Sequence, residues 1–196
     1  LYVYDRKTAD IRVFKSDLTK KNTLSSNEIT SILKDHNGGL WFCTLSRGVN
    51  YLPDNYNDFE LYPCSYGNGF NDGQIKSFAQ DNDGNVWFAT DKGLVKFSPK
   101  TRSFNQDPLK GVQLSGKNIN LILINDNTLW VGYMGKGLDE IDLKTHNLKK
   151  YPTERSDTEN ALNDNSIMSL FLSSEGNMLV GTTRGANEIH TKSGVV

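Results

Sequence analysis

The stretch that decides the fold is Gln74-Ile75-Lys76-Ser77-Phe78-Ala79-Gln80-Asp81, followed by Asn85-Val86-Trp87-Phe88-Ala89-Thr90 and by Gly93-Leu94-Val95-Lys96-Phe97. Apolar and polar residues alternate in these runs, and an Asp-Asn-Asp-Gly turn separates the first two. This is the pattern of short antiparallel strands joined by tight turns. The same phrase occurs in three further copies, the last of them weaker, at residues 27–51, 118–142 and 166–189. The chain is therefore built from one repeated β unit.

The tryptophan of each copy sets the length of the repeat. Trp41, Trp87 and Trp130 and, in the fourth copy, Leu179 lie 46, 43 and 49 residues apart. A period of this size with four short strands per copy is typical of β-propeller blades rather than of helical solenoids. We therefore predict an all-β propeller in which each tryptophan is a buried apolar plate between neighbouring blades.

Turn signals predict where each blade begins and ends. Complete four-stranded blades are expected at 27–62, 74–105 and 118–151, with the end of a preceding blade at 1–14 and an incomplete blade at 165–190. The whole chain is thus one propeller fragment of about four blades. A closed four-bladed ring is conceivable, but interrupted blades at both ends favour an arc of a larger ring. Since an arc exposes apolar surfaces, we expect it to self-associate or to contact a neighbouring propeller.

The composition narrows the classes of protein to consider. The 196 residues are 36% hydrophobic and 23% charged, as in ordinary globular proteins, and no apolar run is long enough to span a membrane. A net charge of −1 argues against a nucleic-acid partner, which needs a basic face. Cys43 and Cys64 are too few for a disulfide scaffold or a zinc site. A bridge between them stays open, although Cys43, beside Trp41 in a strand, is expected to be buried.

The order Asn-x-Ile-x-Ser-Ile, Asp-x-x-Gly, Leu-Trp-Phe-x-Thr and Gly-Leu closely resembles the two-component regulator propeller repeat, over residues 2–14 and 27–190. The resemblance implies seven-bladed propellers, two in tandem, in the sensor region of hybrid histidine kinases of Bacteroidetes. It further implies a periplasmic module that recognises oligosaccharides and regulates polysaccharide utilisation. Kinase, receiver and membrane-contacting parts would then lie elsewhere in the parent receptor, and this chain would not be an enzyme.

No pattern of residues indicates catalysis, a metal or a cofactor. Asp81-Asn82-Asp83-Gly84-Asn85 resembles the start of a calcium loop, but its twelfth position is Lys92 and strands flank it, so a hairpin turn is favoured. The seven glutamates share no position in the repeat, which argues against the carboxylate pair of a glycosidase. His36, His146 and His190 lie in or beside turns without the spacing of metal ligands.

A cation precedes the glycine that opens the third strand of every copy. In a propeller these turns share one face with the long connectors between blades, so the four cations should form an arc that suits anionic ligands such as acidic oligosaccharides. The alternative is that solvated turns simply tolerate Lys and Arg. The four residues are Arg47, Lys92, Lys136 and Arg184.

The connector at residues 63–73 combines aromatic, amide and glycine residues, which is a composition suited to sugars. Tyr66 and Asn68 are the candidate ligand-binding residues of this segment, although Phe70 can equally be a structural latch. Tyr133, which replaces the usual threonine at the end of its strand, is a further candidate.

Three functions remain in competition. The leading hypothesis is a ligand-sensing module without catalytic activity. The second is a protein-interaction or dimerisation scaffold, since propellers often present a rigid face to other proteins. The third, a propeller hydrolase or lyase, is disfavoured by the missing pair of acidic residues.

Overall fold

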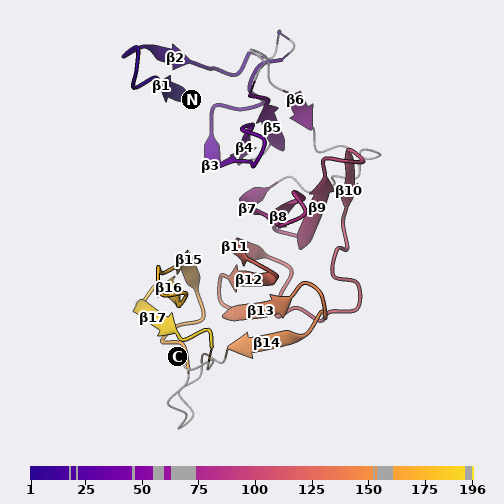
Figure 1. Ribbon diagram of the computed structural model, residues 1–196, viewed down its shortest axis with the longest axis vertical. Coiled ribbons are helices and arrows are strands. Elements are labelled where there is room, and N and C mark those ends of the chain that lie inside the picture. Colours follow the sequence, from indigo (N-terminus) through magenta and orange to yellow (C-terminus); the bar gives the residue numbers. More distant parts are fainter. Residues whose placement is uncertain are drawn as a thin grey trace. The chain divides into compact units, whose positions relative to one another are not determined.

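Strands and turns make up the described part of the chain, which we analysed as a computed structural model (Figure 1). No helix long and apolar enough to cross a membrane occurs in that part. The contacts divide the chain into two compact units, Leu1–Ile75 and Lys76–Val196. The structure describes residues 1–17, 19–20, 22–45, 47–54, 60–62, 74–151, 153, 161–192 and 196.

The first unit contains a two-stranded hairpin and one four-stranded antiparallel sheet, the first blade, with the order β3-β4-β5-β6 (Figure 1). Leu24 and Phe42 form its buried centre, and Leu1, Phe14 and Ile29 pack against them. The strands are β1 (Tyr2–Tyr4), β2 (Ile11–Val13), β3 (Ile29–Lys34), β4 (Leu40–Thr44), β5 (Val49–Leu52) and β6 (Glu60–Tyr62).

The second unit contains two four-stranded blades and a three-stranded one, all antiparallel. The second blade has β7 (Ile75–Gln80), β8 (Val86–Thr90), β9 (Leu94–Ser98) and β10 (Ser103–Asn105). The third has β11 (Ile119–Asn125), β12 (Thr128–Tyr133), β13 (Leu138–Asp142) and β14 (Leu148–Tyr151). The fourth has β15 (Ile167–Leu172), β16 (Met178–Thr182) and β17 (Gly185–Ile189). The prediction of an all-β chain of four-stranded repeats is confirmed.

The second and third blades each bury one face against the blade that follows. Trp87 and Leu94 of the second blade share a core with Ile122, Val131 and Ile141 of the third. In the same way Trp130 and Leu138 of the third blade pack with Ile167, Met178 and Val180 of the fourth. Burial of one large aromatic side chain in this way contributes several kcal/mol before entropy is counted, roughly 5 kcal/mol for about 200 Å².

The tryptophans are core residues, as the repeat predicts. Trp41, Trp87 and Trp130 are 2%, 3% and 2% exposed. Leu179, which holds the same position in the fourth blade, is 37% exposed, so its apolar face is less covered. Cys43 is buried beside Trp41, and its burial raises the pKa of the thiol well above the ordinary value.

The spacing of six residues between aspartate and tryptophan has a direct structural reason. Asp81 Oδ2 accepts a hydrogen bond of 2.8 Å from Trp87 Nε1, while Asp81 Oδ1 accepts from the backbone N–H groups of Asp83 and Asn85 at 3.1 and 2.8 Å. Asp35 holds Trp41 in the same way at 2.9 Å. The carboxylate thus closes the hairpin turn and satisfies the buried indole N–H.

The third and fourth copies, which lack this aspartate, close the turn with other groups. Ile124 stands six residues before Trp130, and Asp126 adopts a left-handed conformation with φ 53° to make a tighter turn. In the fourth blade Ser173 Oγ accepts from the backbone N–H of Asn177 at 3.1 Å. The loss of the aspartate therefore changes the turn but leaves the hairpin intact.

We expect Asp81→Ala to destabilise the second unit by about 2–3 kcal/mol, because it leaves the buried Trp87 indole and two turn N–H groups without their charged acceptor. Urea unfolding followed by tryptophan fluorescence measures this change. Asp83→Ala removes a carboxylate from an exposed position of the same turn and serves as the control. Equal destabilisation by the two substitutions would contradict the role given to Asp81.

Candidate functional site

The turns that join the second and third strands of each blade lie at the same end as the connectors between blades. In the second unit the turn at 134–137 is bound to the connector at 161–166, because Asn165 O accepts from Gly135 N at 3.0 Å and from Gly137 N at 2.8 Å. We call this end of the second unit, with its turns at 91–93, 134–137 and 183–184, the rim. Residues 106–118 and 161–166 are its connectors.

A threonine at the end of the second strand shapes these turns. Thr90 Oγ1 donates to Gly93 O at 2.8 Å and accepts from Lys92 N at 3.1 Å. Thr182 Oγ1 accepts from Arg184 N in the corresponding way, at 3.1 Å. The backbone N–H groups of Lys92 and Arg184 are therefore held in place by these threonines, while both side chains are exposed.

The structure places the predicted cations as follows. Lys92, Lys136 and Arg184 occupy equivalent turns of the three consecutive blades of the second unit, and all three are exposed. Arg47 is exposed in the corresponding turn of the first unit. Tyr66 and Asn68 lie outside the described residues.

Tyr133 belongs to the core of the third blade. Its side chain is 0% exposed and its hydroxyl donates to Asp139 Oδ2 at 2.8 Å. Burial, and then the charge of Asp139, raise the pKa of Tyr133 far above its ordinary value. The ring is therefore not available to a sugar at the surface. Tyr133 stands at the position of the turn threonine, and its buried hydroxyl binds Asp139 of the next strand instead of the turn backbone.

A recurrent polar pair, which the sequence analysis missed, ties each described connector to its blade. Asp139 accepts from Ser115 N at 2.8 Å and from Ser115 Oγ at 2.6 Å. In the first unit Asn50 Oδ1 accepts from Ser25 N at 2.8 Å. The signal is present in the sequence as an Asn or Asp two residues after the glycine that opens the third strand. Its partner lies 24 or 25 residues earlier, in the connector.

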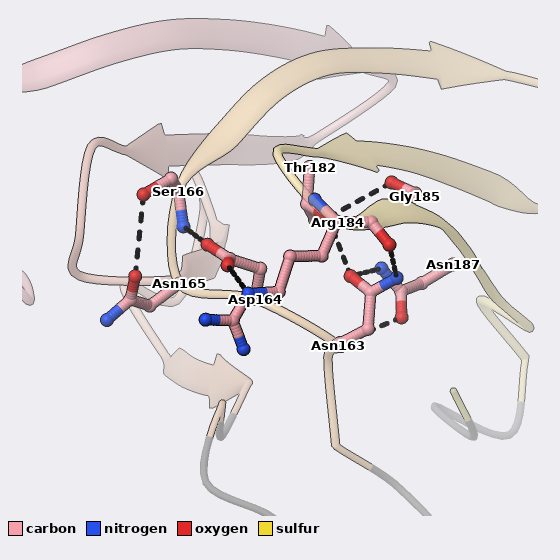
Figure 2. A network of polar contacts seen from close by, with 8 residues as sticks. All are labelled: Asn163, Asp164, Asn165, Ser166, Thr182, Arg184, Gly185 and Asn187. Carbon is pink, nitrogen blue, oxygen red and sulfur yellow. Dashed lines mark hydrogen bonds and ion pairs between the residues drawn. The ribbon is translucent and has the colours of Figure 1, made fainter.

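Figure 2 shows the fourth-blade version of this pair. Asn163 Oδ1 accepts from Asn187 Nδ2 at 3.0 Å and from Thr182 Oγ1 at 2.6 Å, while Asn187 Oδ1 accepts from Asn163 N at 3.0 Å. Beside it, Arg184 Nε forms an ion pair of 3.1 Å with Asp164 Oδ2. One cation of the rim is thus already paired within the chain.

The carboxyl group of Asp164 has a second partner. Its Oδ1 accepts from Ser166 N at 2.7 Å, and this hydrogen bond is the largest cause that lowers the pKa of Asp164, with Arg184 contributing less (Figure 2). Asp164 therefore stays ionised and keeps the connector at 163–166 attached to the turn of the fourth blade.

A cavity of about 450 Å³ opens on the rim between the second and third blades. The turn at 92–94 forms one wall, and the connector from Gln106 to Lys117 forms the other. Its volume lies within the range of small-molecule sites. No group of three or more His, Cys, Asp or Glu side chains that could hold a metal occurs among the described residues.

The fold and this rim define the chain as part of a β-propeller. The β-propeller domain of Cps50 (Swd1) from Myceliophteria thermophila is similar with a TM-score of 0.63 and 12% identity, over 89% of this chain and 56% of that one. The extracellular domain of BT4673 from B. thetaiotaomicron, named a one-component system, gives a TM-score of 0.72 and 20% identity, over 89% of this chain and 22% of that one. The prediction of a partial propeller is confirmed.

Two segments of the chain also match a known repeat family. Residues 23–46 and 69–92 match the model described as the two component regulator propeller. The extracellular domain of the hybrid two-component system BT3049 from B. thetaiotaomicron gives a TM-score of 0.54 and 22% identity, over 94% of this chain and 30% of that one. At these identities the likeness concerns the fold. The chain spans less than a third of the two B. thetaiotaomicron domains. No curated protein matches the sequence.

Alkaline pH should destabilise the third blade through its two buried tyrosines. Tyr151 donates to Glu140 Oε2 at 2.7 Å, and burial and Glu140 raise its pKa as burial and Asp139 raise that of Tyr133. The unfolded tyrosines ionise near pH 10 while the folded ones stay protonated. The free energy of unfolding should therefore be unaffected well below pH 10 and fall above it, by up to about 1.4 kcal/mol per pH unit for each tyrosine.

Urea unfolding between pH 8 and pH 11 measures this slope. The double variant Tyr133→Phe, Tyr151→Phe should be less stable at pH 8 and lose less stability above pH 10. Tyr2→Phe, at a position 75% exposed, is the control and should keep the slope of the unsubstituted chain. An unchanged slope in the double variant would show that other groups cause the alkaline loss.

Proposed function

We propose that the chain is a ligand-sensing module in the periplasmic part of a two-component receptor, and that it recognises oligosaccharides and regulates polysaccharide utilisation. The observation that carries this proposal is the match of two repeats to the two component regulator propeller family. Likeness to extracellular domains of B. thetaiotaomicron systems supports an extracytoplasmic place. The parent receptor would supply the kinase and the connection to the membrane.

The module acts by binding and carries out no reaction. The carboxylates best placed by the repeat are used structurally, since Asp35 and Asp81 hold tryptophans and Asp139 holds a connector. A ligand can switch such a receptor only if it binds one arrangement of the propeller more tightly than another. The rim is where this difference arises, because connectors from one blade contact turns of the next there.

Binding of a panel of acidic and neutral oligosaccharides to the chain tests this proposal, by thermal unfolding and by titration calorimetry. A recognised saccharide at 100 times its Kd should raise the unfolding midpoint by about 5 °C or more. Chromatography of the recovered saccharide should show it unchanged. Failure of every saccharide to bind would overturn saccharide sensing by this chain, and cleavage of the sugar would revive a propeller hydrolase or lyase.

An interaction scaffold is the second candidate, and one surface favours it. The fourth blade exposes Met168, Phe171 and Leu179, which are 50%, 62% and 37% exposed. In the other two blades of this unit, the following blade covers the residues at the positions of Phe171 and Leu179. These residues are Ala79 and Trp87 in the second blade, and Leu123 and Trp130 in the third. The matching occupant is another blade of this repeat, supplied by a second copy of the chain or by a neighbouring propeller.

Sedimentation velocity at increasing protein concentration measures this association. We expect the chain to form dimers or larger species and Phe171→Glu to shift it to the monomer, because a carboxylate on this face would be desolvated without a partner. Met134→Glu, at an exposed apolar side chain of a rim turn, is the control and should associate like the unsubstituted chain. A chain that stays monomeric, or a variant that still associates, would contradict the use of this face.

A further inference from the structure

The rim cavity between the second and third blades combines an apolar floor with a polar edge. Leu94 and Leu109 are buried beneath it, and Val112 and Leu114 are half-buried along the connector. Gln106 and Gln113 are exposed at its edge. An apolar floor suits the C–H face of a sugar ring, while side-chain amides both donate to and accept from hydroxyl groups.

The charge at the edge of the cavity is positive. Lys92 from the β8–β9 turn and Lys117 from the connector line it, and Asp107 is the one acidic residue of the lining. Within the part of the chain that the structure describes, the Lys117 ammonium has no hydrogen-bond or ion-pair partner. An anion in the cavity would therefore meet two cations, one from a turn of the second blade and one from the connector.

The wall that carries Lys117 is held in one position before any ligand binds. Ser115 is fixed to the buried Asp139 by its backbone N–H and its hydroxyl. The neighbouring Gly116 packs beside the Tyr133 ring and the Lys136 side chain, which a Cβ at this position would reach at the ordinary contact distances of 3.4 and 3.5 Å. A preformed wall reduces the ordering entropy that binding has to overcome.

The geometry points to this cavity as a binding site for an anionic saccharide of one or two rings, with Lys92 and Lys117 on its charged group and Gln106 and Gln113 on its hydroxyls. The saccharide class rests on the proposed function, whereas the site and its preference for an anion rest on the cavity itself. Carboxylated and sulfated sugars share the required chemistry, so both are tested.

Titration calorimetry with digalacturonate, a sulfated disaccharide and neutral galactobiose measures the preference for charge. We expect at least one acidic disaccharide to bind at least tenfold more tightly than galactobiose at low salt, with the difference shrinking as salt is raised. Amide NMR spectra of the labelled chain should then shift at residues 106–117 and 92–94. Tighter binding of galactobiose, or shifts confined to other parts of the chain, would overturn the inference.

Two single substitutions and a matched control test the residues. Lys92→Gln and Lys117→Gln should each weaken binding of the acidic disaccharide about tenfold, because each removes a charge-assisted hydrogen bond. Lys100→Gln removes the same charge from the exposed turn at the other end of the second blade and should leave the affinity unchanged. Circular dichroism confirms that the variants fold. Unchanged affinity in both rim variants would overturn the assignment.

The outcomes separate this inference from the proposed function. If a saccharide binds but neither lysine matters, the chain still senses sugars and the cavity is not the site. If no saccharide binds, the proposal that the chain senses saccharides is wrong, and the cavity is not a saccharide site. Octanoate, an anion with an apolar body and no hydroxyls, serves as the last probe. If octanoate binds and needs both lysines while no saccharide binds, the assignment of the ligand as a saccharide is overturned.

Discussion

The structure depends on the need to cover both apolar faces of each four-stranded sheet. The second and third blades meet this need by presenting a tryptophan, Trp87 or Trp130, to the blade that follows. A buried indole brings with it an N–H that must find an acceptor. In the second blade Asp81 supplies that acceptor and closes the adjacent hairpin with the same carboxylate. One residue therefore couples the local turn to the packing between blades.

Because the strands are used for packing, the turns and connectors at the ends of the blades are where exposed polar side chains can lie. The strands have little freedom to carry exposed functional groups, because their side chains alternate between two packed faces. Polar pairs such as Asp139 with Ser115 and Asn187 with Asn163 attach the connectors to the third strands of the sheets by hydrogen bonds. The described connectors vary in sequence but are anchored at an equivalent point of their blades.

The period of the repeat was sufficient to predict the fold, because the spacing of strands and turns recurs in every copy. The role of Tyr133 was not predictable, since a sequence gives the residue type but not the direction of the side chain. A tyrosine at the position of a turn threonine points inward here because Asp139 offers a buried acceptor. Similarly, the six-residue spacing of Asp81 and Trp87 was visible, but only the structure shows that an indole hydrogen bond requires it.

The rim cavity could not be predicted for a different reason. Its wall at 106–117 belongs to a connector whose sequence differs from that of the connectors in the other copies, so the repeat carries no information about it. Lys92 was visible as a repeated cation, whereas Lys117 falls outside the repeated positions. The polar partners of such a wall lie some 24 residues away in sequence, which local patterns do not connect.

A ligand in this cavity would contact a turn of the second blade and the connector that leads to the third, and this gives it a route to influence how these two blades pack. The β8–β9 turn moves with the second blade, while Ser115 and Asp139 attach the opposite wall to the third blade. The blades themselves are joined by close-packed side chains, which tolerate discrete rearrangements better than gradual deformation. An anion held between Lys92 and Lys117 favours the spacing at which both can reach it. The affinity of the cavity for its ligand is thus linked to the packing between neighbouring blades, and by reciprocity any partner that changes this packing must change the affinity.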